Sequence, residues 1–286
     1  HRTAPAPRLL DRSFLTSRFL EQGLSVTALN NFLECPWKYF FLNLIRLPRA
    51  QNRSQLYGIA VHSALKQFFS ILAEGQTKNY LLESFKKSLA RQPLKDEDLA
   101  VFLERGTRSL GGYFDIYSQI WNKNTISEYG IAGVFVDVPD MDVKILLRGK
   151  LDKIEFLSET RVNVVDYKTA KPQTRNAIMG DTKSSSGDYF RQLVFYRMLL
   201  DGHEDGKYFM ESGEIDFVEP NEKGDYKKEQ FLIERNHIDE LTETIRQVSR
   251  DILKFSFVEK DCGDADCEFC EIRKTLLTVG ELRSNL

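Results

Sequence analysis

Residues 149–169 constrain the fold of this chain more than any other stretch. They read GKLDKIEF, a polar turn, and then RVNVVDYKT. Two short runs of β-branched and apolar residues flank the turn at residues 158–160, a pattern typical of a β-hairpin. Asp152 falls in the first strand, and Asp166 and Lys168 fall at the end of the second. Because side chains alternate across a strand, Asp166 and Lys168 leave the same face of the predicted sheet.

Charged groups at the end of an apolar strand need an explanation, because an unpaired charge is costly to bury. A structural ion pair in a half-exposed sheet is one explanation, and such networks are common at strand ends. A metal site is the other. Two carboxylates would bind a hard cation, and a lysine would lie beside the water that the cation activates. The spacing alone leaves both explanations open.

Four sequence motifs occur in one order along the chain: GIAVH at 58–62, GKLDKI at 149–154, VVDYKT at 164–169 and QLVFY at 192–196. Together they resemble the RecB-like branch of the PD-(D/E)XK nucleases, over about residues 25–270. The resemblance implies an α/β fold with a restriction-endonuclease-like core, in which helices flank a mixed central sheet, and a helical region at the N-terminal side.

The resemblance also implies a metal site that binds Mg²⁺ or Mn²⁺. It assigns Asp152, Asp166 and His62 as ligands, with the backbone carbonyl of Tyr167 as a further ligand. Mg²⁺ suits the oxygen ligands, and Mn²⁺ tolerates an imidazole better. Without the resemblance, His62 is more simply read as a core residue, because it shares a helix face with apolar side chains such as Leu65.

Further residues match catalytic and DNA-binding positions of these nucleases. Lys168 would orient the attacking water or stabilise charge in the transition state, and Glu128 matches an additional catalytic acid. Gln192 and Tyr196 lie four apart in a predicted helix and so share one face. The resemblance places them along the DNA channel. The alternative is a buried amide that bonds the edge of the sheet.

Cysteines form a second pattern. Cys262, Cys267 and Cys270 are clustered, whereas Cys35 lies far upstream. Four cysteines are too few for a disulfide scaffold in a chain of 286 residues, and clustered cysteines favour metal. One cysteine before the nuclease core and three after it resemble the arrangement in the AddB-type nucleases, and this resemblance implies a 4Fe–4S cluster. Zn²⁺ would accept four thiolates equally well. Four ordinary thiols are the third possibility.

Charge gives weaker guidance about partners. The formal net charge is −2, whereas a basic balance is the usual sign of nucleic-acid binding. Up to residue 53 the balance is basic, which fits either a solvated surface or contact with DNA phosphates. The basic residues there are Arg2, Arg8, Arg12, Arg18, Lys38, Arg46, Arg49 and Arg53. No apolar run reaches the roughly 18 residues of a membrane span, so we expect no membrane partner and a cytoplasmic, nucleoid-associated protein.

The chain divides, on its patterns, into a tail or linker at 1–22, a helical region at 23–125 with Cys35 and His62, a nuclease core at 126–260, and the cysteine cluster with a C-terminal tail at 261–286. Helices are predicted at 28–34, from 36 onward, and at 57–72, 80–90, 98–121, 189–200 and 238–255. Strands are predicted at 128–138, 143–156, 162–167, 208–218 and 226–233. Residues 174–188 are rich in Gly and Ser and predict a mobile loop.

The predicted function is metal-dependent hydrolysis of DNA, more as an exonuclease than as an endonuclease, on a single strand or a duplex end. The chain begins at His1 without Met, which suggests a piece of a longer protein. By resemblance, a helicase domain in the same chain or complex is the expected partner, in DNA repair or recombination. The alternative is a silent module that binds DNA ends. A P-loop ATPase is disfavoured, because the chain has no GxxxxGK[ST] motif.

Overall fold

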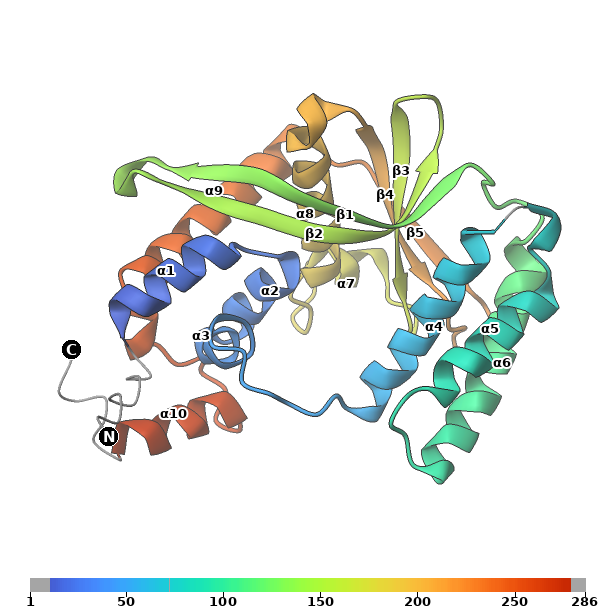
Figure 1. Ribbon diagram of the computed structural model, residues 1–286, viewed down its shortest axis with the longest axis horizontal. Coiled ribbons are helices and arrows are strands. Elements are labelled where there is room, and N and C mark those ends of the chain that lie inside the picture. The colour runs from blue at the N-terminus through green and yellow to red at the C-terminus, as the bar shows by residue number, and fades with distance from the viewer. Residues whose placement is uncertain (1–10, 72, 279–286) are drawn as a thin grey trace, which may run out of the picture. The chain divides into compact units, whose positions relative to one another are not determined.

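A computed structural model of the chain describes residues 11–71 and 73–278 (Figure 1). The fold is α/β, as predicted, with a five-stranded sheet in the order β1-β2-β3-β4-β5 in this part of the chain. The strands are β1 (Thr125–Val138), β2 (Val143–Phe156), β3 (Arg161–Lys168), β4 (Phe209–Phe217) and β5 (Lys227–Phe231). The helices are α1 (Arg12–Gln22), α2 (Val26–Glu34), α3 (Pro36–Tyr39), α4 (Arg53–Phe69), α5 (Lys78–Ala90), α6 (Asp96–Tyr117), α7 (Arg175–Met179), α8 (Asp188–Gly202), α9 (Arg235–Leu253) and α10 (Glu268–Thr278).

The chain folds into two compact units that alternate along the sequence. The first unit takes its described residues from 1–49, 132–148 and 239–286, and the second consists of 50–131 and 149–238. The long strands β1 and β2 therefore contribute one half to each unit. Cys35 belongs to the first unit and His62 to the second, although the sequence suggested one helical region for both.

The second unit is built on a mixed sheet. Strand β2 pairs antiparallel with β3, β3 pairs parallel with β4, and β4 pairs antiparallel with β5. Val165 and Tyr167 of β3 pack into an apolar core formed with α4, α5 and α6. Asp166, which lies between them in the sequence, projects from the opposite face, where its carboxylate accepts a hydrogen bond from Tyr196 of α8. Helices thus cover both faces of the sheet, which is the predicted nuclease-like architecture.

A buried ion pair lies on the face of the sheet toward the α4–α6 core. Lys153 is fully buried, with its ammonium 2.7 Å from a carboxylate oxygen of Glu155 and 4.2 Å from the centre of the Phe69 ring. The side-chain amide of Asn163 donates to the other oxygen of Glu155 at 3.1 Å. Two opposite charges that are largely removed from water stabilise each other only while both are present.

Replacing Lys153 with methionine is expected to destabilise the protein by about 3–5 kcal/mol, because Glu155 keeps a buried charge without its cation. This corresponds to a fall of about 10 °C in the unfolding temperature, measured by circular dichroism. The double variant Lys153→Met/Glu155→Met serves as the control and should recover most of the loss. A single variant as stable as the wild type would mean that the ion pair does not hold this face together.

The first unit begins with two helices whose starts follow local signals. The Ser25 side chain accepts the Ala28 amide at 3.2 Å and caps α2, as predicted, and Pro36 occupies the first turn of α3. The chain then continues through a π-helical turn, η1 (Phe40–Leu44), into the core of this unit. There the Trp37 ring lies 5.9 Å from that of Phe257, which belongs to the short helix η5 (Ser256–Glu259).

Some segments differ from the sequence-based expectation. Residues 12–22 form α1 rather than a tail, because Asp11 caps the helix and Leu15 and Phe19 are buried. The expected loop at 174–188 contains α7, whose first turn is capped by Thr174. Residues 1–10, Leu72 and residues 279–286, which belong to the expected tails and to one helix end, lie outside the described part. Within that part, no helix combines the length and the apolar character needed to cross a bilayer.

Candidate active site

Asp152 and Asp166 lie on neighbouring strands of the second unit. The register of β2 with β3 runs to the pair of Lys153 and Val165, and Asp152 and Asp166 are the next residues of the two strands. Burial and the charge of Asp152 both raise the pKa of Asp166, as expected for two carboxylates that lie close together. The two carboxylates predicted from the sequence to act together are therefore neighbours in the fold.

Asp152 is held by two nitrogen atoms. Its Oδ2 accepts the backbone N–H of Tyr167 at 3.0 Å and lies 3.3 Å from Nδ1 of His62 on α4. Burial raises the pKa of Asp152, but the hydrogen bond and charge of His62 and the Tyr167 N–H outweigh it and lower that pKa. Asp152 is thus kept ionised, and His62 lies beside it. The carbonyl of Tyr167 has no described contact here, and its role stays a prediction.

Asp166 is almost fully buried, with 1% of its surface exposed. Its Oδ1 accepts from the amide of Gln192 at 2.6 Å and from the hydroxyl of Tyr196 at 3.0 Å. Its Oδ2 lies 2.6 Å from the Lys168 ammonium, yet no described donor makes a hydrogen bond of good geometry to it. Burial raises the pKa of Asp166, although Lys168 opposes that shift. Oδ2 is therefore a buried acceptor with unused capacity.

Lys168 closes this polar group. Its ammonium donates to the Gln192 carbonyl oxygen at 2.7 Å and lies 4.3 Å from the centre of the Tyr189 ring. Burial lowers the pKa of Lys168, but the charge of Asp166 outweighs burial and raises it, so the lysine stays charged. Gln192 bonds Asp166 through its nitrogen and Lys168 through its oxygen, which fixes the position of each relative to the other.

Two glycines of the sequence motifs stand where the backbone must come close to another element. A Cβ on Gly149 would lie 2.7 Å from a methyl group of Leu199 in α8. A Cβ on Gly58 of α4 would lie 3.2 Å from the hydroxyl of Thr169, just past the end of β3. These glycines let α8 and α4 approach the strands that carry Asp152 and Asp166.

Glu128 is less clearly part of this group. Its carboxylate pairs with Lys150, and its backbone has a positive φ of 57°. No described contact joins Glu128 to His62, Asp152 or Asp166, and its catalytic role stays a prediction. Among described residues, the only three or more Cys, His, Asp or Glu side chains with ligand atoms all within 4.8 Å are the four cysteines.

Sequence and structure comparisons decide the family. A family model described as the PD-(D/E)XK nuclease superfamily matches residues 23–275, most of the chain. The chain belongs to the PD-(D/E)XK nuclease superfamily. The four motifs discussed above all lie inside the matched range. Its members use divalent metals, and DNA is the substrate class that a nuclease of this family suggests.

One solved structure agrees with the fold of this PD-(D/E)XK nuclease. The crystal structure of a protein provisionally named as an exonuclease, from Eubacterium rectale, is 13% identical, with a TM-score of 0.51, over 95% of this chain and 94% of that one. The structure of a protein named SSO0001 is also 13% identical, over 93% and 94% of the two chains, but its TM-score is 0.39. A search of curated proteins found no match.

The four cysteines of the nuclease lie together in the first unit. The Sγ atom of Cys35 is 3.7 Å from those of Cys267 and Cys270, and Cys262 Sγ is 3.6 Å from Cys270 Sγ. Burial raises the pKa of Cys35. Burial also raises that of Cys267, but backbone N–H groups at the start of α10 and the Cys262 thiol lower it overall. The arrangement is compatible with a zinc or iron–sulfur site.

Sequence reasoning missed two side chains that bear on the active site of the nuclease. Tyr189, which lies under the Lys168 ammonium, stands three residues before Gln192, and that helical spacing is a signal that could have found it. Arg105 of α6 donates to the carbonyl of Thr169 at 3.3 Å and pairs with the buried Glu219. Nothing in its local sequence marks Arg105, because the contact joins segments 64 residues apart.

Replacing Gln192 with alanine is expected to reduce DNA cleavage by about 10- to 100-fold, the usual cost of losing a group that orients metal ligands. The change frees Lys168 and Asp166 from their common partner. The rate on an end-labelled oligonucleotide measures the effect. Gln247→Ala, on the exposed side of α9, is the control and should cut at the wild-type rate. Equal rates for the two variants would remove Gln192 from the site.

Proposed function

We propose that this chain is a Mg²⁺- or Mn²⁺-dependent deoxyribonuclease that hydrolyses phosphodiester bonds at the group formed by Asp152, Asp166, His62 and Lys168. The observation that carries the proposal is the buried carboxylate of Asp166, whose Oδ2 lies 2.6 Å from the Lys168 ammonium and whose charge interacts with that of Asp152. A carboxylate oxygen has more than one acceptor site, so Oδ2 could bind a cation as well as the lysine.

The residues divide the work as follows. A divalent cation, when bound, would activate water and neutralise charge on the phosphate oxygens. Asp152 and Asp166 would hold that cation, and His62 could offer Nε2 while its Nδ1 donates to Asp152. Such a carboxylate partner is the usual arrangement for a metal-binding histidine. Lys168, kept charged by Asp166, would orient the water and stabilise the negative charge that develops in the transition state.

Digestion of three DNA forms tests this function. End-labelled single-stranded, linear duplex and circular DNA are incubated with Mg²⁺, with Mn²⁺ or with a chelator. We expect cleavage only with metal, and exonuclease action predicts that circular DNA survives while both linear forms are shortened from their ends. Binding of DNA ends without any cutting would instead support the alternative function, a silent end-binding module. Full activity in chelator would exclude the proposed mechanism.

We also propose that the four cysteines hold a structural metal centre. The separations of 3.6–3.7 Å between sulfur atoms match the edge of a tetrahedron around one ion with metal–sulfur bonds of about 2.3 Å, as in a Cys₄ zinc site. A 4Fe–4S cluster is larger than one ion and would need the sulfurs to move apart. The protein is purified without oxygen and its iron, sulfide and zinc are measured. Near-stoichiometric iron and sulfide identify the cluster, and one zinc per chain identifies a single ion.

A helicase partner is the last part of the proposal, and it rests on the resemblance to AddB-type nucleases. A motor that feeds a separated strand to the site would raise its local concentration there, which suits a nuclease with little sequence preference. Action in DNA repair or recombination follows from such a pairing. The test compares this chain with its full-length parent on long linear duplex with ATP. Processive digestion by the isolated chain without ATP would contradict the pairing.

A further inference from the structure

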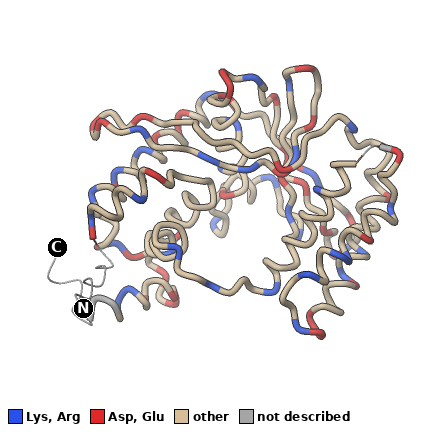
Figure 2. Tube along the Cα trace, viewed as in Figure 1, with Lys and Arg blue, Asp and Glu red and all other residues tan. Residues whose placement is uncertain are grey.

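Lys and Arg are interspersed with Asp and Glu along the chain (Figure 2), and most described basic side chains of the first unit have an acidic partner. One pocket of this unit departs from that pattern. It has a volume of about 250 Å³, and its lining contains two arginines and no acidic residue. The lining residues are Gln22, Gly23, Ser25, Ala28, Tyr39, Leu42, Asn43, Arg46, Leu47 and Arg148.

Backbone contacts bring Arg148 to this pocket. The N–H of Leu24 donates to the carbonyl of Leu146 at 2.8 Å, and the N–H of Arg148 donates back to Leu24 at 3.0 Å. The turn depends on Gly23, which has a positive φ of 64° and whose added Cβ would lie 2.1 Å from the Leu146 oxygen. The link fixes the first half of β2 beside the start of α2, where Ser25 caps the helix.

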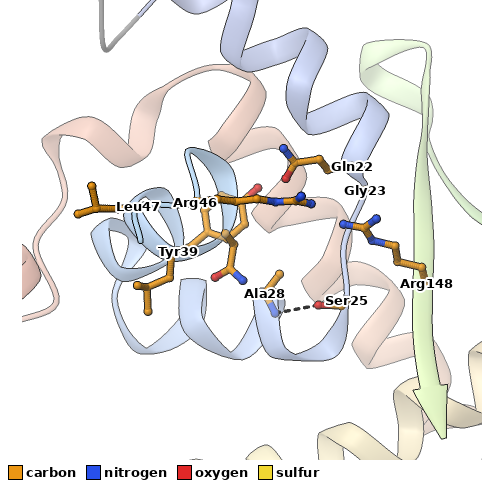
Figure 3. A pocket seen from close by; sticks show the side chains of 10 residues that line it. Gln22, Gly23, Ser25, Ala28, Tyr39, Arg46, Leu47 and Arg148 are labelled. Carbon is orange, nitrogen blue, oxygen red and sulfur yellow. Dashed lines mark hydrogen bonds between the residues drawn. The ribbon is translucent and has the colours of Figure 1, made fainter. Parts of the chain in front are cut away.

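Arg46 reaches the same space from the end of η1. Its backbone has a positive φ of 55°, an unfavourable conformation for a residue with a side chain. In Figure 3 the Arg46 and Arg148 side chains point toward each other, with Gln22 above them and Ser25 below. Among the described residues, no carboxylate lies within 4.0 Å of either guanidinium, so these two like charges face each other without a counter-ion from the chain.

Neutral donors complete the lining. Oδ1 of Asn43 accepts from the amide of Asn31 at 2.8 Å, which leaves the Asn43 NH₂ group available to the pocket. Gln22 adds a second side-chain amide to the lining. Guanidinium groups and side-chain amides donate hydrogen bonds, and the two positive charges favour a negatively charged ligand.

We propose that this pocket binds a backbone phosphate of a nucleic-acid strand. Its volume lies below the roughly 300–1,000 Å³ of pockets that enclose a whole small molecule, so it suits one anionic group of a larger ligand. Two guanidiniums can each contact a phosphate through two N–H groups, a geometry that lysine cannot offer. The inference rests on the proposed function, which makes a DNA strand the substrate, and adds a phosphate-binding position that belongs to the first unit.

The test measures how salt weakens the binding of a fluorescent single-stranded oligonucleotide to the full chain, with chelator present so that nothing is cut. For Arg46→Gln/Arg148→Gln, loss of the one neutralised phosphate lowers the slope of log affinity against log salt by about 0.7. That is a loss of about 5-fold in affinity at 0.1 M salt. The control, Lys144→Gln/Lys254→Gln, removes the same charge from exposed positions outside the pocket and should leave the slope unchanged.

Three outcomes separate the possibilities. A lower slope in the arginine variant alone, with unfolding temperatures like the wild type, supports the phosphate-binding pocket. If both variants have the same salt slope as the wild type, the phosphate-binding pocket is overturned. The nuclease proposal still stands in that case, because the wild type binds DNA. If the wild type binds no DNA, the proposed function itself fails. Inorganic phosphate is the further probe: a pocket for free phosphate would raise the wild-type unfolding temperature without changing either DNA slope, which also overturns the inference.

Discussion

Replacing Asp166 with asparagine should reduce cleavage by a factor of at least about 1,000, or about 4 kcal/mol of transition-state stabilisation. The change keeps the size of the side chain but removes the charge that would hold the cation and that keeps Lys168 protonated. Single-turnover cleavage of an end-labelled oligonucleotide at saturating Mg²⁺ measures the loss. The alanine variant should be equally inactive, because neither replacement can supply the charge.

The control for this experiment is Glu211→Gln on the neighbouring strand β4. It is the same kind of change, an acid to its amide, at a half-buried residue paired with Arg161. We expect its cleavage rate to stay within about twofold of the wild type, since surface ion pairs contribute little. Unfolding curves show whether each variant is folded. A folded Asp166→Asn protein that cuts at the wild-type rate would remove Asp166 from the mechanism.

Replacing Cys35 with serine should destabilise the protein by about 3–5 kcal/mol, or roughly 10 °C in unfolding temperature. Cys35 is buried where α2 ends and α3 begins, 3.7 Å from the sulfurs of Cys267 and Cys270. A bound metal would therefore join the start of the chain to its C-terminal helix α10 within the first unit. Loss of one ligand should release the metal, which is measured as iron and zinc per chain beside the unfolding temperature.

Val26→Thr, in the same helix α2, is the matched control. This change also buries a hydroxyl at a position of similar size, but it leaves all four thiols in place. It therefore measures the ordinary cost of burying a hydroxyl, about 1–3 kcal/mol. We expect that variant to keep its metal. Protein that is colourless, free of zinc and stably folded in the wild type would contradict a metal centre, and Cys35→Ser would then cost no more than Val26→Thr.

Much of the active site could be predicted from local sequence, because the signals are short. The alternation of residues 149–169 predicted β2 and β3 and the common face of Asp166 and Lys168. Helical spacing predicted that Gln192 and Tyr196 project together, and both now contact Asp166. These predictions succeed because strand and helix periods fix side-chain direction without any knowledge of the rest of the chain.

Other features depend on contacts between distant segments. The helix α1 carries few periodic apolar residues, and only its packing through Leu15 and Phe19 reveals it. Lys153 has no local sequence signal of burial, because it packs against the Phe69 ring, which comes from α4. The pocket with Arg46 and Arg148 likewise joins segments about a hundred residues apart. No local pattern contains that information, since each partner is reached only through the tertiary fold.

The central claim is that a divalent cation binds between Asp152 and Asp166. Crystals of the protein soaked in Mn²⁺ test it most directly, because Mn²⁺ can be located by its anomalous scattering. We predict a peak within about 2.5 Å of a carboxylate oxygen of each aspartate, with the His62 ring beside it, and no peak in Asp166→Asn crystals. The account would be contradicted if the wild-type protein cuts DNA in solution with Mn²⁺ but its soaked crystals show no Mn²⁺ at these carboxylates.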